Sequence, residues 1–117
     1  MKPTPIEYFG DWNPYSSPEK CGLVLVDCLD LSETEDSFNY LCVWEEKITG
    51  RLYCAYDSGC SCPMPFEDYH KLSQFELIQL GTIERIKEEL RENSYVRMEI
   101  AQEFLYELRK ALKEVKG

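Results

Sequence analysis

The sequence predicts an α+β fold: a small antiparallel three-stranded meander, followed by two or three helices packed on one face of that sheet. Two patterns lead to this expectation. Residues 22–56 contain three short runs rich in β-branched and aromatic residues, whereas residues 73–117 carry apolar residues at helical spacing. Because strands follow strands and helices follow helices, a parallel β-α-β arrangement is disfavoured.

The chain has 117 residues, the size of a single domain, and 44% of them are hydrophobic. Within that domain we expect an irregular aromatic arm over 1–20, the sheet over 21–57, a cysteine- and proline-rich corner over 58–72, and helices over 73–117. No apolar run approaches the about 20 residues of a membrane span. The N-terminal residues lack the apolar stretch of a secretory signal, which predicts a cytosolic protein.

The first half of the chain divides into an arm and three strands. Four prolines interrupt residues 1–20, but the aromatic residues between them predict that this arm lies over the sheet. We expect strands at 22–29, 38–45 and 51–56. The last two are joined by a hairpin over 46–50, in which Gly50 supplies a positive φ.

The second half carries helix boundary signals. Ser73 and Glu76 form a capping-box pattern, which predicts a short helix ending near Gly81. Thr82 then caps a second helix, which must break near Asn93 because its apolar stripe ends there. The final helix has a continuous apolar stripe, formed by Val96, Ile100, Ala101, Phe104, Leu105, Leu108, Ala111, Leu112 and Val115.

The negative charge is concentrated in the first part of the chain. The net charge is −9, and residues 1–72 carry 13 acidic against 5 basic side chains, a balance of −8. Such a surface repels phosphate backbones, which argues against direct nucleic-acid binding, and it attracts basic protein surfaces. The alternative is that the charge serves solubility alone.

Six cysteines raise the question of metal binding. In a reducing cytosol they are expected to be thiols or metal ligands rather than disulfides. Cys60 and Cys62 can offer two thiolates to zinc, with Cys54 as a third ligand, but their C-x-C spacing differs from the usual C-x₂-C. We therefore predict no cofactor, and keep a zinc-stabilised domain as the alternative. Three cysteines fall in or beside expected strands and are predicted to be small buried apolar residues: Cys21, Cys28 and Cys42.

Catalytic patterns are weak. A nucleophilic cysteine needs a base, and His70 is the single histidine in the sequence. No nucleotide-binding glycine motif is present. We predict that the protein is not an enzyme, with a thiol-dependent enzyme as the third reading.

Two segments are candidate contact surfaces for a partner protein. One is the corner after the third strand, and the other is the acidic loop after the first. The predicted contact residues are Asp57, Ser58, Cys60, Cys62, Phe66, Glu33, Glu35 and Asp36. The alternative for the loop is a solvated segment without a partner.

The runs Y-L-C-V-W (40–44), T-G-R-L-Y (49–53) and S-G-C-S-C-P-M-P-F-E (58–67) resemble a family of small uncharacterised proteins encoded by phages of actinobacteria. The resemblance is strongest over residues 22–70. It implies an intracellular phage protein in the cytoplasm of an infected bacterial host, with Cys60 and Cys62 as the shared pair and the other four cysteines particular to this chain. The family has no assigned activity. Together these observations predict a small acidic phage accessory protein that binds a host or phage protein.

Overall fold

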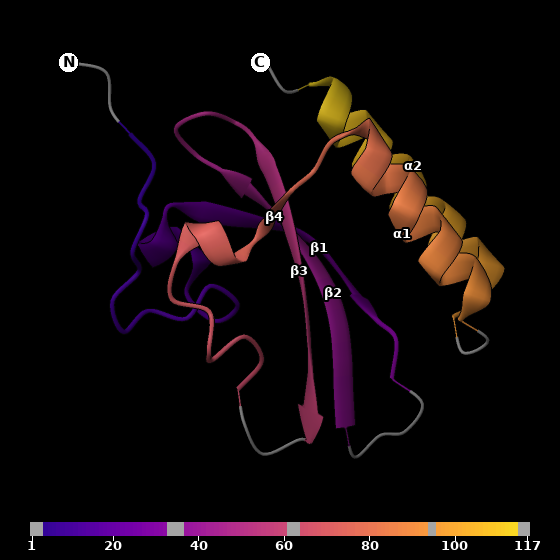
Figure 1. Cartoon of the computed structure of the whole chain (residues 1–117), viewed down its shortest axis with the longest axis horizontal. Helices are drawn as coiled ribbons and strands as arrows, with labels where there is room; N and C mark the ends of the chain where they lie inside the picture. The colour runs from indigo at the N-terminus through magenta and orange to yellow at the C-terminus, as the bar shows by residue number, and fades with distance from the viewer. Residues whose placement is uncertain (1–3, 33–36, 61–63, 94–95, 115–117) are drawn as a thin grey trace.

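A computed structural model describes residues 4–32, 37–60, 64–93 and 96–114. One antiparallel sheet contains four strands in the order β1-β2-β3-β4, and two α-helices follow it in the chain (Figure 1). The strands are β1 (Leu23–Asp30), β2 (Ser37–Glu46), β3 (Leu52–Cys60) and β4 (Glu76–Leu77). The helices are α1 (Leu80–Glu92) and α2 (Met98–Lys113), with short 3-10 turns η1 (Pro18–Cys21) and η2 (Leu72–Gln74). The α+β class and the meander are confirmed, whereas the sheet has one strand more than expected.

The β2–β3 hairpin is built as the sequence predicts. Gly50 has a φ of 75°, and its N–H donates to the Glu46 carbonyl over 2.8 Å. The Glu46 side chain is almost fully buried, at 1% exposure, and both of its carboxylate oxygens accept hydrogen bonds from this turn. A buried carboxylate therefore organises the connection between the two longest strands.

Strand β3 continues further than expected. Cys60 pairs with Ser37, and Gly59 pairs with Phe38, so the start of the predicted corner is regular strand. The reason is the length of β2, which begins at Ser37 and supplies partners for these residues. Residues 61–63 lie outside the described part of the chain.

The predicted helix after Ser73 is wrong. Only the 3-10 turn η2 forms there, and β4 follows it, pairing Glu76 with Cys54 of β3. Helix α1 begins at Leu80, so Gly81 lies inside the helix, and the Thr82 hydroxyl accepts a hydrogen bond from the Gln79 N–H over 3.2 Å. Pairing with the edge of β3 satisfies the backbone of this segment and outweighs the local capping signal. The predicted break near residue 93 is confirmed.

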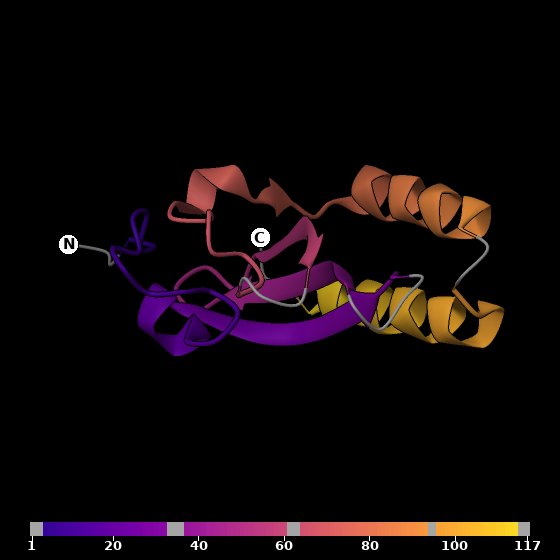
Figure 2. The ribbon, with the colours of Figure 1, turned by 90° about the horizontal axis from the view of Figure 1, so that it is seen from below.

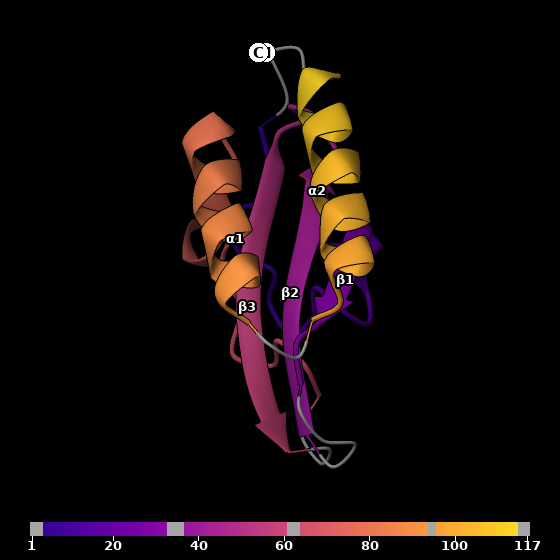
Figure 3. The same cartoon turned by 90° about the vertical axis from the view of Figure 1, so that its right-hand side faces the viewer.

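The two helices lie side by side over one face of the sheet (Figure 3). Ile83, Ile86 and Leu90 of α1 are buried against this face, as the sequence predicts. Ile100, expected on the buried stripe of α2, is 46% exposed instead. The buried side chains of this core are Leu29, Leu31, Leu41, Val43, Leu52, Cys54, Ile78, Ile83, Ile86, Leu90, Phe104, Leu105 and Leu108.

The N-terminal arm and the segment around η2 form a second core with the other side chains of the sheet. Figure 2 shows these segments on the left, away from the two helices on the right. Trp44 of β2 lies at the centre of this core, and its rings meet Phe66 and Phe75 edge-on at 5.1 and 4.9 Å. The Trp44 indole N–H donates to the Pro14 carbonyl over 2.9 Å, which ties the arm to the sheet. The buried members of this core are Phe9, Cys21, Leu23, Cys42, Trp44, Ala55, Phe66, Leu72 and Phe75.

Candidate functional site

The predicted contact residues at the end of β3 do not form one exposed surface. Ser58 is exposed, but Phe66 is fully buried in the aromatic core and has no surface to offer a partner. The Asp57 carboxylate accepts a hydrogen bond from the Phe66 N–H over 2.6 Å, and Phe66 has a φ of 63°. Asp57 thus fixes the return of the chain toward the core. The prediction of Phe66 as a contact residue is wrong, because a large ring near a hydrophobic sheet face gains more by burial.

The remaining predicted contact residues lie outside what the structure describes. This holds for Glu33, Glu35, Asp36 and Cys62, and for the side chain of Cys60. Because Ser37 pairs with Cys60, the acidic loop and the cysteine corner are attached to the same end of the sheet. Their role in contacts remains a prediction.

The described part of the chain contains no set of side chains arranged to bind a metal ion. Within residues 4–32, 37–60, 64–93 and 96–114, no three His, Cys, Asp or Glu side chains are placed to hold a metal ion. A zinc-stabilised domain using Cys60 and Cys62 stays the alternative to the prediction of no cofactor, and elemental analysis of protein purified without chelator would test it. Among the same residues, no helix is both long and apolar enough to cross a membrane.

The described free thiols are poorly suited to nucleophilic chemistry. Cys21 and Cys54 are both buried at 1% exposure. Burial raises the pKa of the Cys21 thiol to about 11, and burial followed by the nearby charge of Glu76 raises the pKa of Cys54 to about 12. A thiol with a raised pKa is a poor nucleophile, because the thiolate is the reactive form.

Cys28 and Cys42 are joined by a disulfide across neighbouring strands. They are register partners in the β1–β2 ladder, with Cα atoms 4.1 Å apart. The expectation that all cysteines are thiols or metal ligands is wrong for this pair. The interpretation of Cys28 and Cys42 as small buried apolar residues did not include the strand register. This register places the two side chains directly opposite each other.

A polar network that the sequence analysis missed connects the sheet to α1. Arg85 forms a two-point ion pair with Glu76 of β4, at 2.5 and 2.6 Å, and contacts Glu89 over 3.2 Å. The Tyr56 hydroxyl donates to Glu89, and burial followed by this hydrogen bond raises the pKa of Tyr56 above its ordinary value. All partners in the network are satisfied, so it holds α1 in place rather than presenting a reactive group. The i,i+4 spacing of Arg85 and Glu89 was the one signal available in the sequence.

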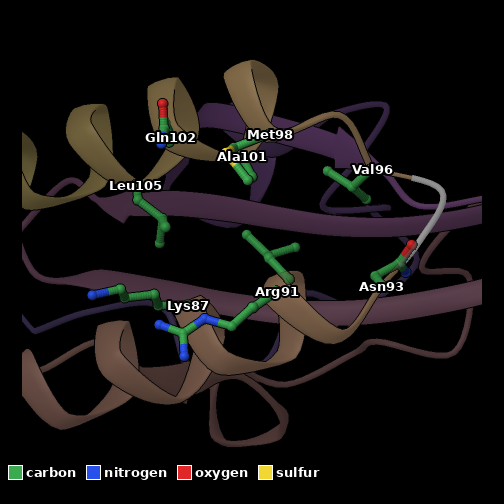
Figure 4. A pocket seen from close by; sticks show the side chains of 9 residues that line it. Lys87, Arg91, Asn93, Val96, Met98, Ala101, Gln102 and Leu105 are labelled. Carbon is green, nitrogen blue, oxygen red and sulfur yellow. The ribbon is translucent and has the colours of Figure 1, made fainter.

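A hollow of about 260 Å³ lies between the two helices (Figure 4). Leu90, Val96 and Leu105 give it apolar walls, and Lys87 and Arg91 stand at its rim. None of its described lining residues is a carboxylate or an imidazole, so it offers apolar contact and positive charge but no acid–base pair. Its volume is below the range of about 300–1,000 Å³ typical of ligand pockets.

A second hollow, of about 290 Å³, lies between β1 and α2 and is acidic. Asp27 of β1 and Glu103 and Glu107 of α2 contribute three carboxylates. Its apolar lining comes from Cys28, Leu29, Ile100 and Phe104. We call this hollow the acidic groove.

Comparison with known protein families assigns all of the chain except its first residues to one family. A model of a domain of unknown function, DUF7574, matches residues 12–117. The chain belongs to the DUF7574 family. No curated protein and no solved structure matches it.

The DUF7574 chain thus carries two hollows of opposite character, neither of which the sequence predicted. The one between the helices joins residues near in sequence, whereas the acidic groove joins Asp27 to Glu103 from distant parts of the chain. The charge balance of residues 1–72 could not reveal this groove, because two of its three carboxylates come from the nearly neutral second part.

Proposed function

We propose that this DUF7574 chain is a non-enzymatic accessory protein of a phage, and that it acts in the host cytoplasm by binding a host or phage protein. The proposal rests on a contrast in burial between the reactive thiols and the charged carboxylates of this chain. The described free thiols are buried with raised pKa values, whereas the carboxylates of the acidic groove line a surface hollow. Such an arrangement supports recognition rather than bond-making chemistry.

The charge defines the kind of partner. With a net charge of −9, the protein attracts basic protein surfaces and repels nucleic acid. The end of the sheet that carries the acidic loop and the cysteine corner adds a second region for contact, through Asp57, Ser58, Cys60 and Cys62. A partner with a basic surface fits both regions.

The cytoplasmic location bears on the state of Cys28 and Cys42. The structure holds these two cysteines as a disulfide, and a reducing compartment would convert them to a pair of adjacent thiols. The intact mass of protein rapidly alkylated in the host lysate distinguishes these two states. Alkylation of both residues supports the location, and a protected disulfide contradicts it.

Affinity capture tests the proposed function. The tagged full chain is used to recover proteins from lysate of an infected bacterial host, with an unrelated protein of equal size and net charge as the control. We expect a partner that is enriched over the control, that captures the chain in the reciprocal experiment, and that dissociates as salt is raised to about 1 M, where the screening length falls to about 3 Å. Failure to recover any protein in both directions would contradict the proposal.

A further inference from the structure

One edge of the sheet is open. Among the residues that the structure describes, β1 is the first strand in the order β1-β2-β3-β4, and β2 is its single neighbour in the sheet (Figure 1). The short Cα separation of Cys28 and Cys42, 4.1 Å, is typical of a non-hydrogen-bonded pair, in which both residues turn their peptide groups away from each other. The peptide groups of Cys28 therefore face the open side of β1. The peptide groups of Asp30, two residues further along the regular ladder, also face the open side of β1.

The chain around this edge is suited to accept another strand. Val24 and Val26 are β-branched and 44% and 41% exposed. After the register shift between Leu25 and Asp27, regular pairing continues to Asp30. The Cys28 N–H donates to the carboxylate of its own neighbour, Asp27, over 2.8 Å, which covers an outward donor in the free protein. An incoming carbonyl can replace that carboxylate and free it to meet a cation.

The acidic groove runs beside this edge and defines the charge of the incoming strand. Among the residues that the structure describes, Asp27, Glu103 and Glu107 form no ion pair. Glu103 and Glu107 stand one turn apart on α2, a spacing at which like charges repel. Leu29 and Phe104 form a buried floor below them, and Ile100 is half exposed beside them.

The spacing of the carboxylates matches that of a strand. Residues four apart on a helix are about 6 Å apart along its axis, and alternate residues of a strand are about 6.6 Å apart. Figure 3 shows α2 running along the strands of the sheet. Alternate side chains of a strand added beside β1 thus meet Glu103 and Glu107 in turn.

We propose that β1 accepts an extended basic segment of the partner protein as a fifth strand, with lysine or arginine side chains at alternate positions entering the acidic groove. This mode of binding rests on the proposed function and names the surface and the chemistry of the partner. Backbone hydrogen bonds to β1 supply affinity, and the carboxylates supply selection. A second copy of the chain is disfavoured as the occupant, because two β1 edges would bring Asp27 and Asp30 of both copies together.

Binding of defined peptides tests this proposal. The probe is a labelled ten-residue peptide in which lysine alternates with valine or threonine, and its binding to the full chain is followed by fluorescence anisotropy. One comparison peptide has glutamate in place of every lysine. Another keeps the lysines but is N-methylated at alternate peptide bonds, which removes the donors of one edge. We expect each comparison peptide to bind at least about tenfold more weakly than the probe.

Matched protein variants distinguish the effect of the groove carboxylates on peptide affinity from the effect of the overall net charge. The variant D27N/E103Q/E107Q removes three charges from the acidic groove, whereas E67Q/D68N/E92Q removes three exposed charges elsewhere. Both change the net charge from −9 to −6. We expect the groove variant to lose about tenfold in affinity for the lysine peptide and the control less than about twofold, since distant exposed charges are screened. Circular dichroism confirms that both variants are folded.

Four results would overturn the proposal. The first is equal binding of the N-methylated peptide, the second is an equal loss in the two variants, and the third is hydrogen-exchange protection on a surface other than β1. A dimer that protects β1 without any peptide also overturns it. The captured partner is also tested for retention by the variant D27N/E103Q/E107Q. If the partner is retained equally well, this binding mode is refuted, whereas the proposed function is not. Absence of any captured partner counts against the proposed function itself.

Discussion

Replacing Glu46 with alanine should destabilise the β2–β3 hairpin strongly. The carboxylate is buried at the end of β2, where Oε1 accepts from the Thr49 N–H over 2.7 Å and from the Thr49 hydroxyl over 2.9 Å. Oε2 accepts from the Ile48 N–H over 3.0 Å. Alanine removes all three bonds, and each bond to a charged group contributes about 1.5–3 kcal/mol.

Water compensates part of that loss. Ile48 is 47% exposed and Thr49 is half-buried, so their donors can turn to solvent once the carboxylate is gone. Three bonds at about 1.5 kcal/mol each amount to about 4.5 kcal/mol, and solvation of the freed donors offsets about 2 kcal/mol of this, so we expect Glu46→Ala to reduce the free energy of unfolding by about 2–3 kcal/mol. With an unfolding entropy of about 2.1 cal/mol/K per residue, a chain of this length loses about 4 °C in Tm per kcal/mol, or about 8–12 °C here. Glu46→Gln keeps one acceptor oxygen and should lose about 1 kcal/mol.

Urea unfolding provides the assay, with far-ultraviolet circular dichroism and the fluorescence of the buried Trp44 as independent probes. The matched control is Glu45→Ala, because Glu45 is the exposed neighbour on the same strand. The control should change stability by no more than about 0.5 kcal/mol. If Glu46→Ala were no less stable than Glu45→Ala, the buried carboxylate would not organise the turn.

Three further predictions concern the cores and the disulfide. Trp44→Phe leaves the Pro14 carbonyl without its donor and opens a void, so it should cost about 2–3 kcal/mol in urea unfolding; a loss below 0.5 kcal/mol contradicts the anchoring role of the indole. The raised pKa of Cys54 means that the native state retains this thiol proton between its unfolded value of 9.0 and about 12. Stability should therefore fall as pH rises from about 9 to 12, and Cys54→Val should show a shallower fall; equal slopes for the two proteins would refute this. Reducing the Cys28–Cys42 bond, which spans 14 residues, should lower the free energy of unfolding by about 3 kcal/mol, and an unchanged urea midpoint contradicts it.

The strands and the final helix were predictable because their signals are local. Alternation of Leu52 and Cys54 against Tyr53 sets the two faces of β3, and the spacing of Phe104 and Leu108 sets the buried stripe of α2. The capping-box pattern at Ser73 is also local, but it failed because the following residues pair with β3 instead. Local signals fail where a segment has a competing tertiary partner.

The candidate site was harder to predict than the fold. The contact surface predicted at the corner after β3 includes Phe66, yet the Phe66 ring fills the space beside Trp44. The acidic groove was missed because Asp27 and Glu103 become neighbours only when α2 packs beside β1. Sequence spacing carries no information on such a juxtaposition.

The amino-acid sequence by itself determined the class of fold, the first three strands, the final helix and the net negative charge. Hydrophobic periodicity is a property of short segments, and net charge is a sum over the whole chain. The tertiary structure alone decided the Cys28–Cys42 pairing, the burial of Glu46 and Phe66, and the open edge beside the acidic groove. Strand register and helix docking bring distant residues together, and these depend on how the whole chain buries its apolar surface.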